Sequence, residues 1–518
     1  YAIKRILTPD TGAQYVDLVA AYIAGAAEYY AGETDDFDTV GIKALDDKTV
    51  EITLYNPTSF FADILTILEE ALRGYSAMRE KEGDKLRSDI LSRLDVLEDL
   101  VAKVEERSPV TLKEYREKLT QKMNEVLAST EVDPQRILTE AAIFADKVAV
   151  DEETVRLRSH IDLHLEEGAV IVFCPDLDLY PVIPTVFEGL DTYRCESPIY
   201  AQGCTDISIT GKGVIDGSGD AWRPLKRKKV SEEEWIAKVE SGGVVNAKGD
   251  QWFPSQVYMD LLATSEMNVP RGDFSPEFWE ESKSFLRPVM VSLRECTNVL
   301  LEGCTFRNSP CWNLHPLMCK GLIVKDVTVE NPSYAQNGDG IDIDSCEDVL
   351  LVGSTFAVGD DGICIKSGKN EDGRRRGRPC KGLIVADCYV GHGHGGFVVG
   401  SEMSGGVSNI KVSGCTFEGT DVGLRFKSTR GRGGVVENIW IEDIKMSDIV
   451  TEALLFDLYY GGKSAVEAAE EGTTVDEDIR PVDETTPAFR DIHIKKISCD
   501  GADRAMYFNG LPEMPVSN

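Results

Sequence analysis

The stretch NGDGIDIDS at 337–345 is followed one repeat later by GDDGICIKSG at 359–368. The two segments align on their Gly-Ile pairs without a gap, and this alignment places Asp339 over Asp361. Asp360 falls one position earlier in the same frame. Equivalent residues of a structural repeat lie close together in space when the repeats stack on one another. The alignment therefore predicts that carboxylates from two neighbouring repeats meet.

Two further segments continue this frame, HGGFVVGS at 394–401 and DVGLRFKS at 421–428. The frame places His394 in the column of Asp360. Side chains two residues apart in a strand point to the same face, so the two basic residues of the fourth segment share a face. The four segments together predict that six side chains converge: Asp339, Asp360, Asp361, His394, Arg425 and Lys427.

The same repeat extends over much of the second half of the chain. Related segments such as CTNVLLEGCTF and CEDVLLVGSTF begin at positions 296, 319, 346, 380, 407 and 436, which are 23 to 34 residues apart. Repeats of ~20–50 residues indicate solenoids or propellers. Each repeat holds two or three short strand patterns and no helical one, whereas a propeller blade needs four strands. A parallel β-helix, with equivalent residues stacked ~4.8 Å apart, fits this pattern.

The predicted fold class is mainly β, a parallel β-helix preceded by a helical N-terminal region. Residues 1–65 carry an apolar helical stretch and a strand-like alternation, and 66–160 repeat apolar residues at helical spacing. Short strands begin at about 161 and continue to 518, interrupted at about 220–286 by a helical and loop-like insertion that is rich in Trp and Phe. We therefore expect three parts, at 1–65, 66–160 and 161–518.

The 518 residues carry a formal net charge of −34. A surface of this charge repels nucleic acid. The sequence has no apolar run of ~18 or more residues, the length that a membrane-spanning helix needs. Binding of an anionic polysaccharide would need local basic groups. The chain starts at Tyr1 without a basic-then-apolar leader, so the sequence assigns no compartment, and it assigns no oligomeric state.

Thirteen cysteines are present. In the repeat frame they form two columns, Cys296, Cys319, Cys346 and Cys380 in one and Cys304, Cys388 and Cys415 in the other. A free cysteine behaves as a small hydrophobe, so stacked buried thiols are expected, although disulfides between neighbouring coils are geometrically possible.

The converging residues have the chemistry of a glycosidase site. Carboxylates held close together raise the pKa of at least one of them, so a proton donor and a base can coexist at one pH. Inverting glycosidases use such a pair ~6.5–9.5 Å apart. Arg425 and Lys427 suit a sugar carboxylate, while His394 could tune the acid or bind substrate. Apart from these carboxylates no dense acidic cage or EF-hand loop is visible, so we expect neither a metal nor another cofactor.

Residues from about 162 to 518 resemble glycoside hydrolase family 28, the polygalacturonases and their relatives. Four signatures of the family occur in order: Asn337-Gly338-Asp339, Asp360-Asp361, Gly393-His394-Gly395 and Arg425-Phe426-Lys427. The resemblance implies a right-handed, pectin-lyase-like parallel β-helix. It also implies hydrolysis of α-1,4-galacturonosyl linkages with inversion, on a pectic polysaccharide or oligogalacturonide.

The resemblance assigns roles to individual residues. Asp360 would be the general acid, and Asp339 and Asp361 would hold the attacking water. Three residues would bind substrate: Asn337, Arg425 and Lys427. Arg425 and Lys427 would hold the galacturonate carboxylate, while Asn337 would contact substrate or order its loop. A second Gly-His-Gly, around His392, leaves two candidates for the catalytic histidine, and stacking over Asp360 favours His394.

The segment HGHGGFVVGSEMSGG at 392–406 looks more like the exo-acting members of the family. An insertion as long as 220–286 within a compact domain is usually functional. We therefore expect the insertion to block one end of the substrate groove, so that short units leave from chain ends.

Other readings stay open at this point. A pectate lyase, which needs Ca²⁺ carboxylates and an Arg base, and a non-catalytic carbohydrate-binding β-helix would share the fold. Residues 1–65 look like a segment of the oligopeptide-binding proteins of peptide importers, and 66–160 resemble the C-terminal helical part of YicC-type endoribonucleases. No active-site motif of the latter can be matched, and the acidic charge disfavours RNA processing.

Overall fold

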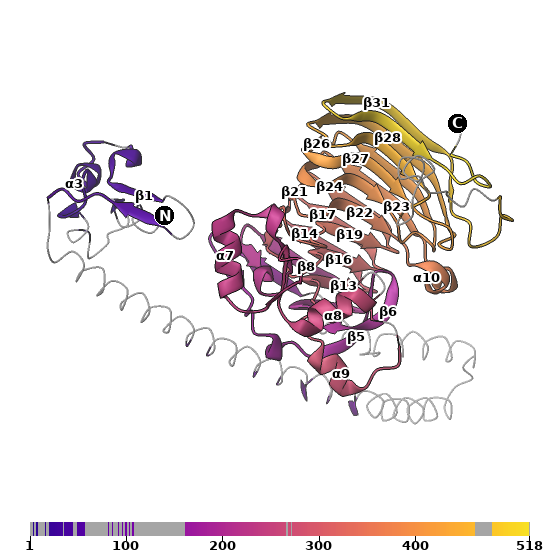
Figure 1. Ribbon diagram of the computed structural model, residues 1–518, viewed down its shortest axis with the longest axis horizontal. Coiled ribbons are helices and arrows are strands. Elements are labelled where there is room, and N and C mark those ends of the chain that lie inside the picture. The colour runs from indigo at the N-terminus through magenta and orange to yellow at the C-terminus, as the bar shows by residue number, and fades with distance from the viewer. Residues whose placement is uncertain are drawn as a thin grey trace, which may run out of the picture. The chain divides into compact units, whose positions relative to one another are not determined.

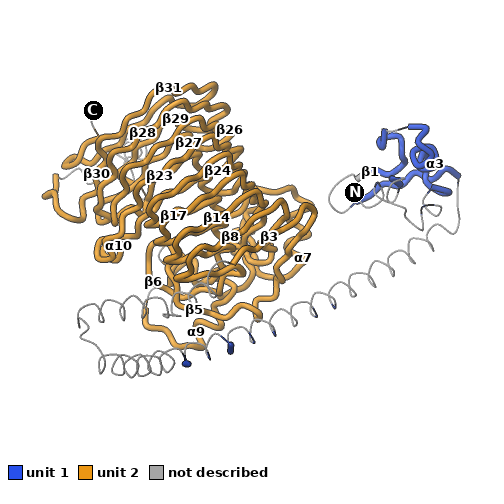
Figure 2. The backbone as a smooth tube through the Cα atoms, turned by 180° about the vertical axis from the view of Figure 1, so that it is seen from behind, with its two compact units in different colours: residues 1–148 blue, residues 149–518 orange. Residues whose placement is uncertain are grey.

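A computed structural model describes residues 20–34, 36–44, 49–56, 161–265, 268–270, 272–460 and 479–516, together with isolated positions up to 107. The chain divides into two compact units, residues 1–148 and 149–518 (Figure 2). The sequence pattern placed the start of the β region at about 161, and the first strand of the second unit, β3, spans Asp162–Leu165.

The first unit contains a short helix and a two-stranded sheet. Helix α3 (Ala26–Tyr30) is followed by the antiparallel pair β1 (Ile42–Ala44) and β2 (Val50–Ile52). The predicted helical segment 66–160 lies almost entirely outside the described residues, although isolated positions between Lys81 and Arg107 are helical. Among the described residues, no helix combines the length and the apolar character needed to cross a membrane.

The second unit is a parallel β-helix, as the repeat predicted (Figure 1). Its described strands form three parallel ladders, called here sheets 1, 2 and 3. Sheet 1 consists of β7 (Ile199–Gln202), β13 (Val291–Arg294), β16 (Leu314–Leu317), β19 (Ile341–Asp344), β22 (Asp361–Lys366), the second half of β24 (Tyr389–Val399), β27 (Thr420–Lys427), β29 (Glu452–Asp457) and β32 (Arg504–Asn509).

Sheets 2 and 3 complete each coil. Sheet 2 runs through β3, β8 (Thr205–Gly211), β14 (Thr297–Glu302), β17 (Lys320–Lys325), β20 (Glu347–Val352), β23 (Cys380–Ala386), β25 (Val407–Ser413), the first half of β28 (Val435–Ser447), β30 (Ala488–Phe489) and the first half of β31 (Ile492–Asp500). Sheet 3 runs through β4 (Val170–Val172), β9 (Val214–Asp216), β15 (Thr305–Arg307), β18 (Thr328–Glu330), β21 (Thr355–Ala357), the start of β24, β26 (Thr416–Glu418) and the ends of β28 and β31.

One corner of each coil explains a recurring feature of the sequence. The third residue of each repeat segment has a positive φ of 52° to 73°, a region that Gly, Asn and Asp adopt more readily than other residues. These corner residues are Asp206, Asn298, Gly321, Asp348, Gly382, Asn409, Asn438 and Asp491. The chain thus places a turn-compatible residue at every passage into sheet 2, which keeps the coils in register.

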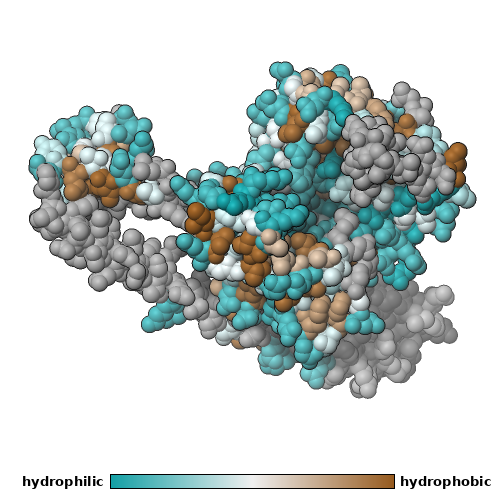
Figure 3. Space-filling model, viewed as in Figure 1, coloured by the Kyte–Doolittle hydropathy of each residue, from teal (hydrophilic) through white to brown (hydrophobic). Residues whose placement is uncertain are grey.

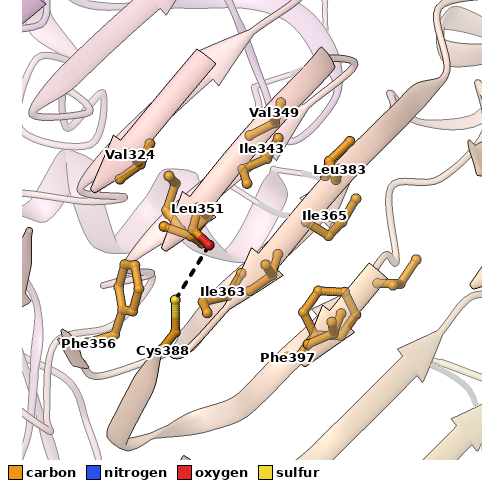
Figure 4. Packing of buried hydrophobic residues seen from close by; sticks show 14 of the residues in the cluster. Val324, Ile343, Val349, Leu351, Phe356, Ile363, Ile365, Leu383, Cys388 and Phe397 are labelled. Atoms are coloured by element: carbon orange, nitrogen blue, oxygen red, sulfur yellow. Dashed lines mark hydrogen bonds between the residues drawn. The ribbon is translucent and has the colours of Figure 1, made fainter. Parts of the chain in front are cut away.

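The coil interior is filled by the inward-facing side chains of all three sheets. Figure 4 shows Ile343, Ile365 and Leu383 from neighbouring strands in this cluster, in which fully buried Ile, Leu, Val and Phe predominate. Burying each such side chain contributes roughly 1.5–3 kcal/mol before the entropy cost of ordering it. Towards the C-terminus the ring of Phe456 stacks on Phe426 and Phe508, at centroid distances of 4.5 and 5.1 Å.

The thirteen cysteines all lie in the described ranges and are free. Both predicted columns are buried, which confirms stacked thiols rather than disulfides. The thiol of Cys388, for example, points toward the carbonyl oxygen of Leu351 at 3.9 Å (Figure 4).

The insertion is a folded element between β9 and β13. It contains a small sheet of β10 (Leu225–Lys226), β11 (Val244–Val245) and β12 (Gln251–Phe253), and the helices α7 (Glu232–Glu240), α8 (Gln256–Thr264) and α9 (Pro276–Glu281). Its own core includes Trp222, Phe253, Tyr258 and Phe285. On the face shown in Figure 3, brown hydrophobic residues gather over the region of α7 and α8, while teal residues cover much of the rest.

A feature that the repeat pattern did not reveal is an antiparallel hairpin before the first complete coil. Strands β5 (Val182–Phe187) and β6 (Leu190–Cys195) pair only with each other among the described strands. Both strands are close in sequence to β7 of sheet 1. Figures 1 and 2 place them beside the insertion, next to α9.

Candidate functional site

The register of sheet 1 confirms the frame that the sequence predicted. Ile341 pairs with Ile363, which places Asp339 beside Asp361, and Asp361 pairs with Gly395, which places Asp360 beside His394. Val398 pairs with Arg425 without a shift. The six predicted residues therefore lie in four successive strands of one sheet or directly before them.

The three carboxylates form a compact group on the outer side of sheet 1. One ligating oxygen each of Asp339, Asp360 and Asp361 lies within 4.8 Å of the others. Asp339 and Asp361 are buried, while the Asp360 side chain is 21% exposed. Burial and the neighbouring charges of Asp342 and Asp360 raise the pKa of Asp339 well above its usual range. The environments of the neighbouring carboxyl groups thus shift their pKa values in opposite directions, upward for Asp339 and downward for Asp360.

His394 is the histidine at this group. Its Nδ1 lies 3.1 Å from Oδ1 of Asp360, and its backbone N–H donates to the Asp360 carbonyl at 2.8 Å. The hydrogen bond with Asp360 raises the pKa of His394. Burial alone would raise the pKa of Asp360, but His394 and the nearby cations lower it to about 2. His392 instead contacts the carbonyl oxygen of Val358 at 2.5 Å, away from the carboxylates.

Arg425 and Lys427 both face Asp361. The Lys427 ammonium donates to Oδ2 at 2.6 Å, and an Arg425 Nη lies 3.5 Å from Oδ1. Lys427 is almost fully buried, whereas the Arg425 side chain is 19% exposed. The ring of Tyr460 lies beside both cations, 5.0 Å from the Lys427 Nζ. The sequence placed these cations on one face but did not reveal that Asp361 is their partner.

Asn337 is tied to the protein rather than free. Its side-chain oxygen accepts a hydrogen bond of 2.8 Å from the buried Arg287 and one of 3.4 Å from Asn268. Arg287 also donates to the backbone carbonyls of Pro310 and Gln336. In this arrangement Asn337 orders the loop that carries Asp339, and Asn268 brings the insertion into contact with the site.

A second layer of charges lies beside the carboxylates, and sequence reasoning missed it. The Lys366 ammonium is 3.2 Å from Asp342 and 3.3 Å from Glu402, and it lies 3.9 Å from the ring centre of Trp312. Burial raises the pKa of Asp342 to about 7, although Lys366 counteracts this. The alternation in GIDIDS and GICIKS carried a signal, since polar residues alternating with inward Ile lie on the outer face.

The β5–β6 hairpin covers the outer face of sheet 1 up to this layer. Phe187 packs on Trp312, with ring centroids 4.4 Å apart, and Trp312 contacts His315 of β16. At the hairpin tip, the carbonyl of Gly189 accepts a hydrogen bond of 3.4 Å from the backbone N–H of Lys369, just after β22. A Cβ at Gly189 would lie 2.6 Å from that nitrogen, so the close approach requires glycine.

Glu188 at this tip predicts a pH-dependent stability. It is buried, and burial together with the charge of Glu402 raises its pKa to about 7 from 4.5. The folded chain thus binds a proton that the unfolded chain releases, so stability falls as pH rises from about 4.5 to 7. At pH 8 the free energy of unfolding of Glu188→Gln is expected to exceed that of wild type by roughly 1–3 kcal/mol. At pH 4.5 the two free energies of unfolding should be nearly equal.

Denaturant unfolding at several pH values measures this difference. Glu330→Gln, which changes an exposed glutamate of β18, is the matched control and should leave the pH dependence as in wild type. If the free energies of unfolding of wild type and Glu188→Gln changed equally with pH, Glu188 would not bind the expected proton in the folded chain.

The arrangement can perform acid–base chemistry on an anionic substrate. It offers neighbouring carboxyl groups whose pKa values differ, together with a pair of cations that the same ligand could contact. The same carboxylates, or Asp339 with Asp342 and Cys364, are also placed closely enough to hold a metal ion. The geometry alone therefore permits both hydrolysis and cation-assisted chemistry.

A family model for the C-terminal part of YicC-like endoribonucleases matches residues 104–168. This confirms the resemblance seen in the helical segment and shifts its range, which the sequence pattern placed at 66–160. Most of the matched residues lie outside the described part of the chain. The similarity of residues 1–65 to oligopeptide-binding proteins stays a prediction.

A second family model, glycosyl hydrolases family 28, matches residues 275–500. A probable polygalacturonase of Vitis vinifera is 24% identical over 368 residues, 70% of this chain and 62% of that relative. An endo-polygalacturonase of Pectobacterium carotovorum is 25% identical over 307 residues, 58% of this chain and 64% of that relative. The chain thus spans less than two thirds of these curated relatives.

Among solved structures, the hyperthermoactive exopolygalacturonase from Thermotoga maritima matches with 31% identity and a TM-score of 0.53. The match covers 66% of this chain and 70% of that protein. With the family model over 275–500 and this similarity together, the chain belongs to family 28 of the glycoside hydrolases.

Proposed function

We propose that this chain hydrolyses α-1,4-galacturonosyl linkages of polygalacturonate. The observation that carries the proposal is the carboxylate group Asp339, Asp360 and Asp361 beside the cations Arg425 and Lys427. Such a site pairs acid–base groups with a binding partner for a sugar carboxylate. Relatives named as polygalacturonases support the same substrate.

In the proposed mechanism Asp360 protonates the leaving oxygen, and Asp339 and Asp361 position the attacking water. A general acid must be protonated, yet the cations and His394 hold the pKa of Asp360 at about 2 without substrate. A substrate carboxylate bound at Arg425 would neutralise part of this positive charge and raise the pKa of Asp360. Substrate binding would thus favour the protonation state that the acid needs, with His394 as the adjacent proton carrier.

The stereochemistry needs its own measurement. Inverting glycosidases typically hold their two carboxyl groups ~6.5–9.5 Å apart and retaining ones ~5–5.5 Å. Here the oxygens lie within 4.8 Å, closer than the inverting spacing expected from sequence. The proposed mechanism is inverting because Asp339 and Asp361 can hold one water on the same side of the bond. Proton NMR of the first product should therefore show the β-anomer from the α-linkage; the α-anomer would establish retention.

The reaction type is tested by incubating the chain with polygalacturonate. Reducing ends should appear without the ultraviolet absorbance of unsaturated uronides, and EDTA should leave the rate unchanged. The carboxylate group could also hold Ca²⁺, which keeps a lyase as the second candidate. Unsaturated products, or loss of activity in EDTA, would establish the lyase. Absence of any cleavage would favour a carbohydrate-binding β-helix.

We further propose that the chain acts from the ends of its polymer. The hairpin tip lies against Gly368 and Lys369, directly after the strand that carries Asp361, so the outer face of sheet 1 is covered on its N-terminal side. The insertion supports this hairpin, since the backbone carbonyl of Asn268 accepts a hydrogen bond of 3.4 Å from Arg194. A polymer entering the site would therefore meet a wall beside the carboxylates.

Early digestion products test the exo mode. We expect monomer or dimer of galacturonate to accumulate while the viscosity of the polygalacturonate solution stays high. A rapid fall in viscosity with mixed oligomers would mean that the polymer passes the hairpin and is cut internally. Fully esterified pectin, which lacks the carboxylate charge, serves as the control substrate and should be cleaved far more slowly.

A further inference from the structure

A cavity distinct from the carboxylate site is lined in part by the β5–β6 hairpin. Its volume is about 520 Å³, within the usual range for small-molecule sites. Three segments line it: the hairpin, the ends of β7 and β13 in sheet 1, and the insertion around α9. The described lining residues include Asp191, Tyr193, Gln202, Trp279 and Arg294.

Arg294 is the distinguishing residue of this cavity. It makes no ion pair with any residue that the structure describes, although the chain carries a net charge of −34. One Nη donates to the carbonyl oxygen of Pro184 at 3.4 Å, and the buried Nε has no hydrogen-bond partner. Asp191, which lines the same cavity, pairs with Arg376 at 3.1 Å. A guanidinium left unpaired in so acidic a protein points to an anionic ligand.

The wall beside Arg294 is aromatic and held in place. Tyr193, which is 41% exposed, packs on Trp279 with ring centroids 4.9 Å apart. Phe274 and Phe278 contact Trp279 edge-on at 5.3 Å each and fix its orientation. Aromatic rings with a fixed orientation and an adjacent polar group are suited to a ligand that has one apolar face and one polar edge, such as a sugar ring.

The cavity lies along the same outer face as the carboxylate site. In the register of sheet 1, Arg294 is aligned through Leu317 and Asp344 with Lys366. Three strand spacings of ~4.8 Å place the backbone of Arg294 about 14 Å from that of Lys366, which lies beside the carboxylates. The hairpin lines the cavity with Asp191 and Tyr193, and its tip contacts Lys369 just after β22.

We propose that this cavity is a second uronide-binding site, in which Arg294 pairs with a galacturonate carboxylate and Tyr193 and Trp279 contact the sugar ring. The inference rests on the proposed function for the identity of the polymer. The site anchors another part of the substrate, or another chain, beside the catalytic groove. It thereby raises the local concentration of chain ends at the carboxylates.

Affinity electrophoresis in gels containing polygalacturonate tests the site. The full chain is used with Asp360→Asn as background, so that the polymer is not consumed. Arg294→Met in this background is expected to weaken retardation by the polymer at least ~10-fold, as loss of a charge-assisted contact implies. Arg490→Met is the matched control, because it removes one surface arginine that pairs with Glu437. It should bind polygalacturonate like the background.

Further arms keep the inference falsifiable. Trp279→Ala is a second variant with the same expected loss, and far-ultraviolet circular dichroism checks that each variant is folded. Equal retardation of Arg294→Met and the background would overturn the site. Equal losses on fully esterified pectin, or equal binding of sulfated dextran, would overturn its assignment to uronide carboxylates. If wild type bound polygalacturonate through Arg294 but did not cleave it, the result would contradict the proposed hydrolysis and support this site.

Discussion

Asp360→Asn is expected to lower kcat on polygalacturonate at least ~100-fold, the range that general acid catalysis supplies. The amide keeps the size of the carboxyl and can still accept the hydrogen bond from His394, which lies 3.1 Å away. It cannot deliver a proton to the leaving oxygen. Because Asp360 does not pair with Arg425 or Lys427, substrate binding should be largely retained, so that KM changes much less than kcat.

A matched carboxylate-to-amide change separates this effect from a general loss of charge. Glu437→Gln alters a glutamate on β28 that pairs with Arg490, away from the six site residues, and should keep kcat near that of wild type. Asp339→Asn and Asp361→Asn should resemble Asp360→Asn if both hold the attacking water. A kcat of Asp360→Asn close to wild type would remove Asp360 from the role of acid.

Lys427→Met is expected to lower kcat/KM on polygalacturonate by roughly 10- to 150-fold. The estimate corresponds to a charge-assisted hydrogen bond worth ~1.5–3 kcal/mol. The change has two effects in this structure. It removes a cation proposed to bind the sugar carboxylate, and it leaves Asp361 without the ammonium at 2.6 Å. A buried carboxylate without its partner binds a proton more readily, so activity should fall most at low pH.

Two comparisons separate these effects. Lys411→Met removes an exposed lysine that pairs with Glu442 and should not change kcat/KM. A methyl-esterified oligogalacturonide lacks the charge that Lys427 would bind, so its kcat/KM should fall less. An equal fall on both substrates would assign Lys427 to the support of Asp361 alone. The double variant Lys427→Met with Asp361→Asn should recover stability lost by Lys427→Met, because no unpaired buried charge remains.

Much of the site could be read from the sequence because the fold repeats. A parallel β-helix stacks equivalent residues of successive coils, so a gap-free alignment of four segments is also a strand register. This is why Asp339 was expected beside Asp361 and His394 beside Asp360, as the paired strands have them. The corner residues with positive φ, at Asn298 and its equivalents, keep that register from slipping.

The partners inside the site were not visible in the same way. Asp361 is held by Arg425 and Lys427, and Asn337 by Arg287, through side-chain contacts that cross coils or enter from the insertion. An alignment of repeats gives the position of a residue along the coil and its face. It does not give the direction of a long side chain, which is decided by neighbours from other segments.

The sequence by itself determined the β-helix, from the repeat segments that begin between 296 and 436, and the register of the six residues that meet on one face, from the alignment within 337–428. The tertiary structure alone decided which segments outside the repeat pack against that face. The β5–β6 hairpin and the insertion lie outside the repeat, and their positions depend on contacts such as Phe187 with Trp312 and Asn268 with Asn337. Those contacts join residues 69 to 125 positions apart, so no local pattern encodes them, and only the packing of the folded chain brings these segments together.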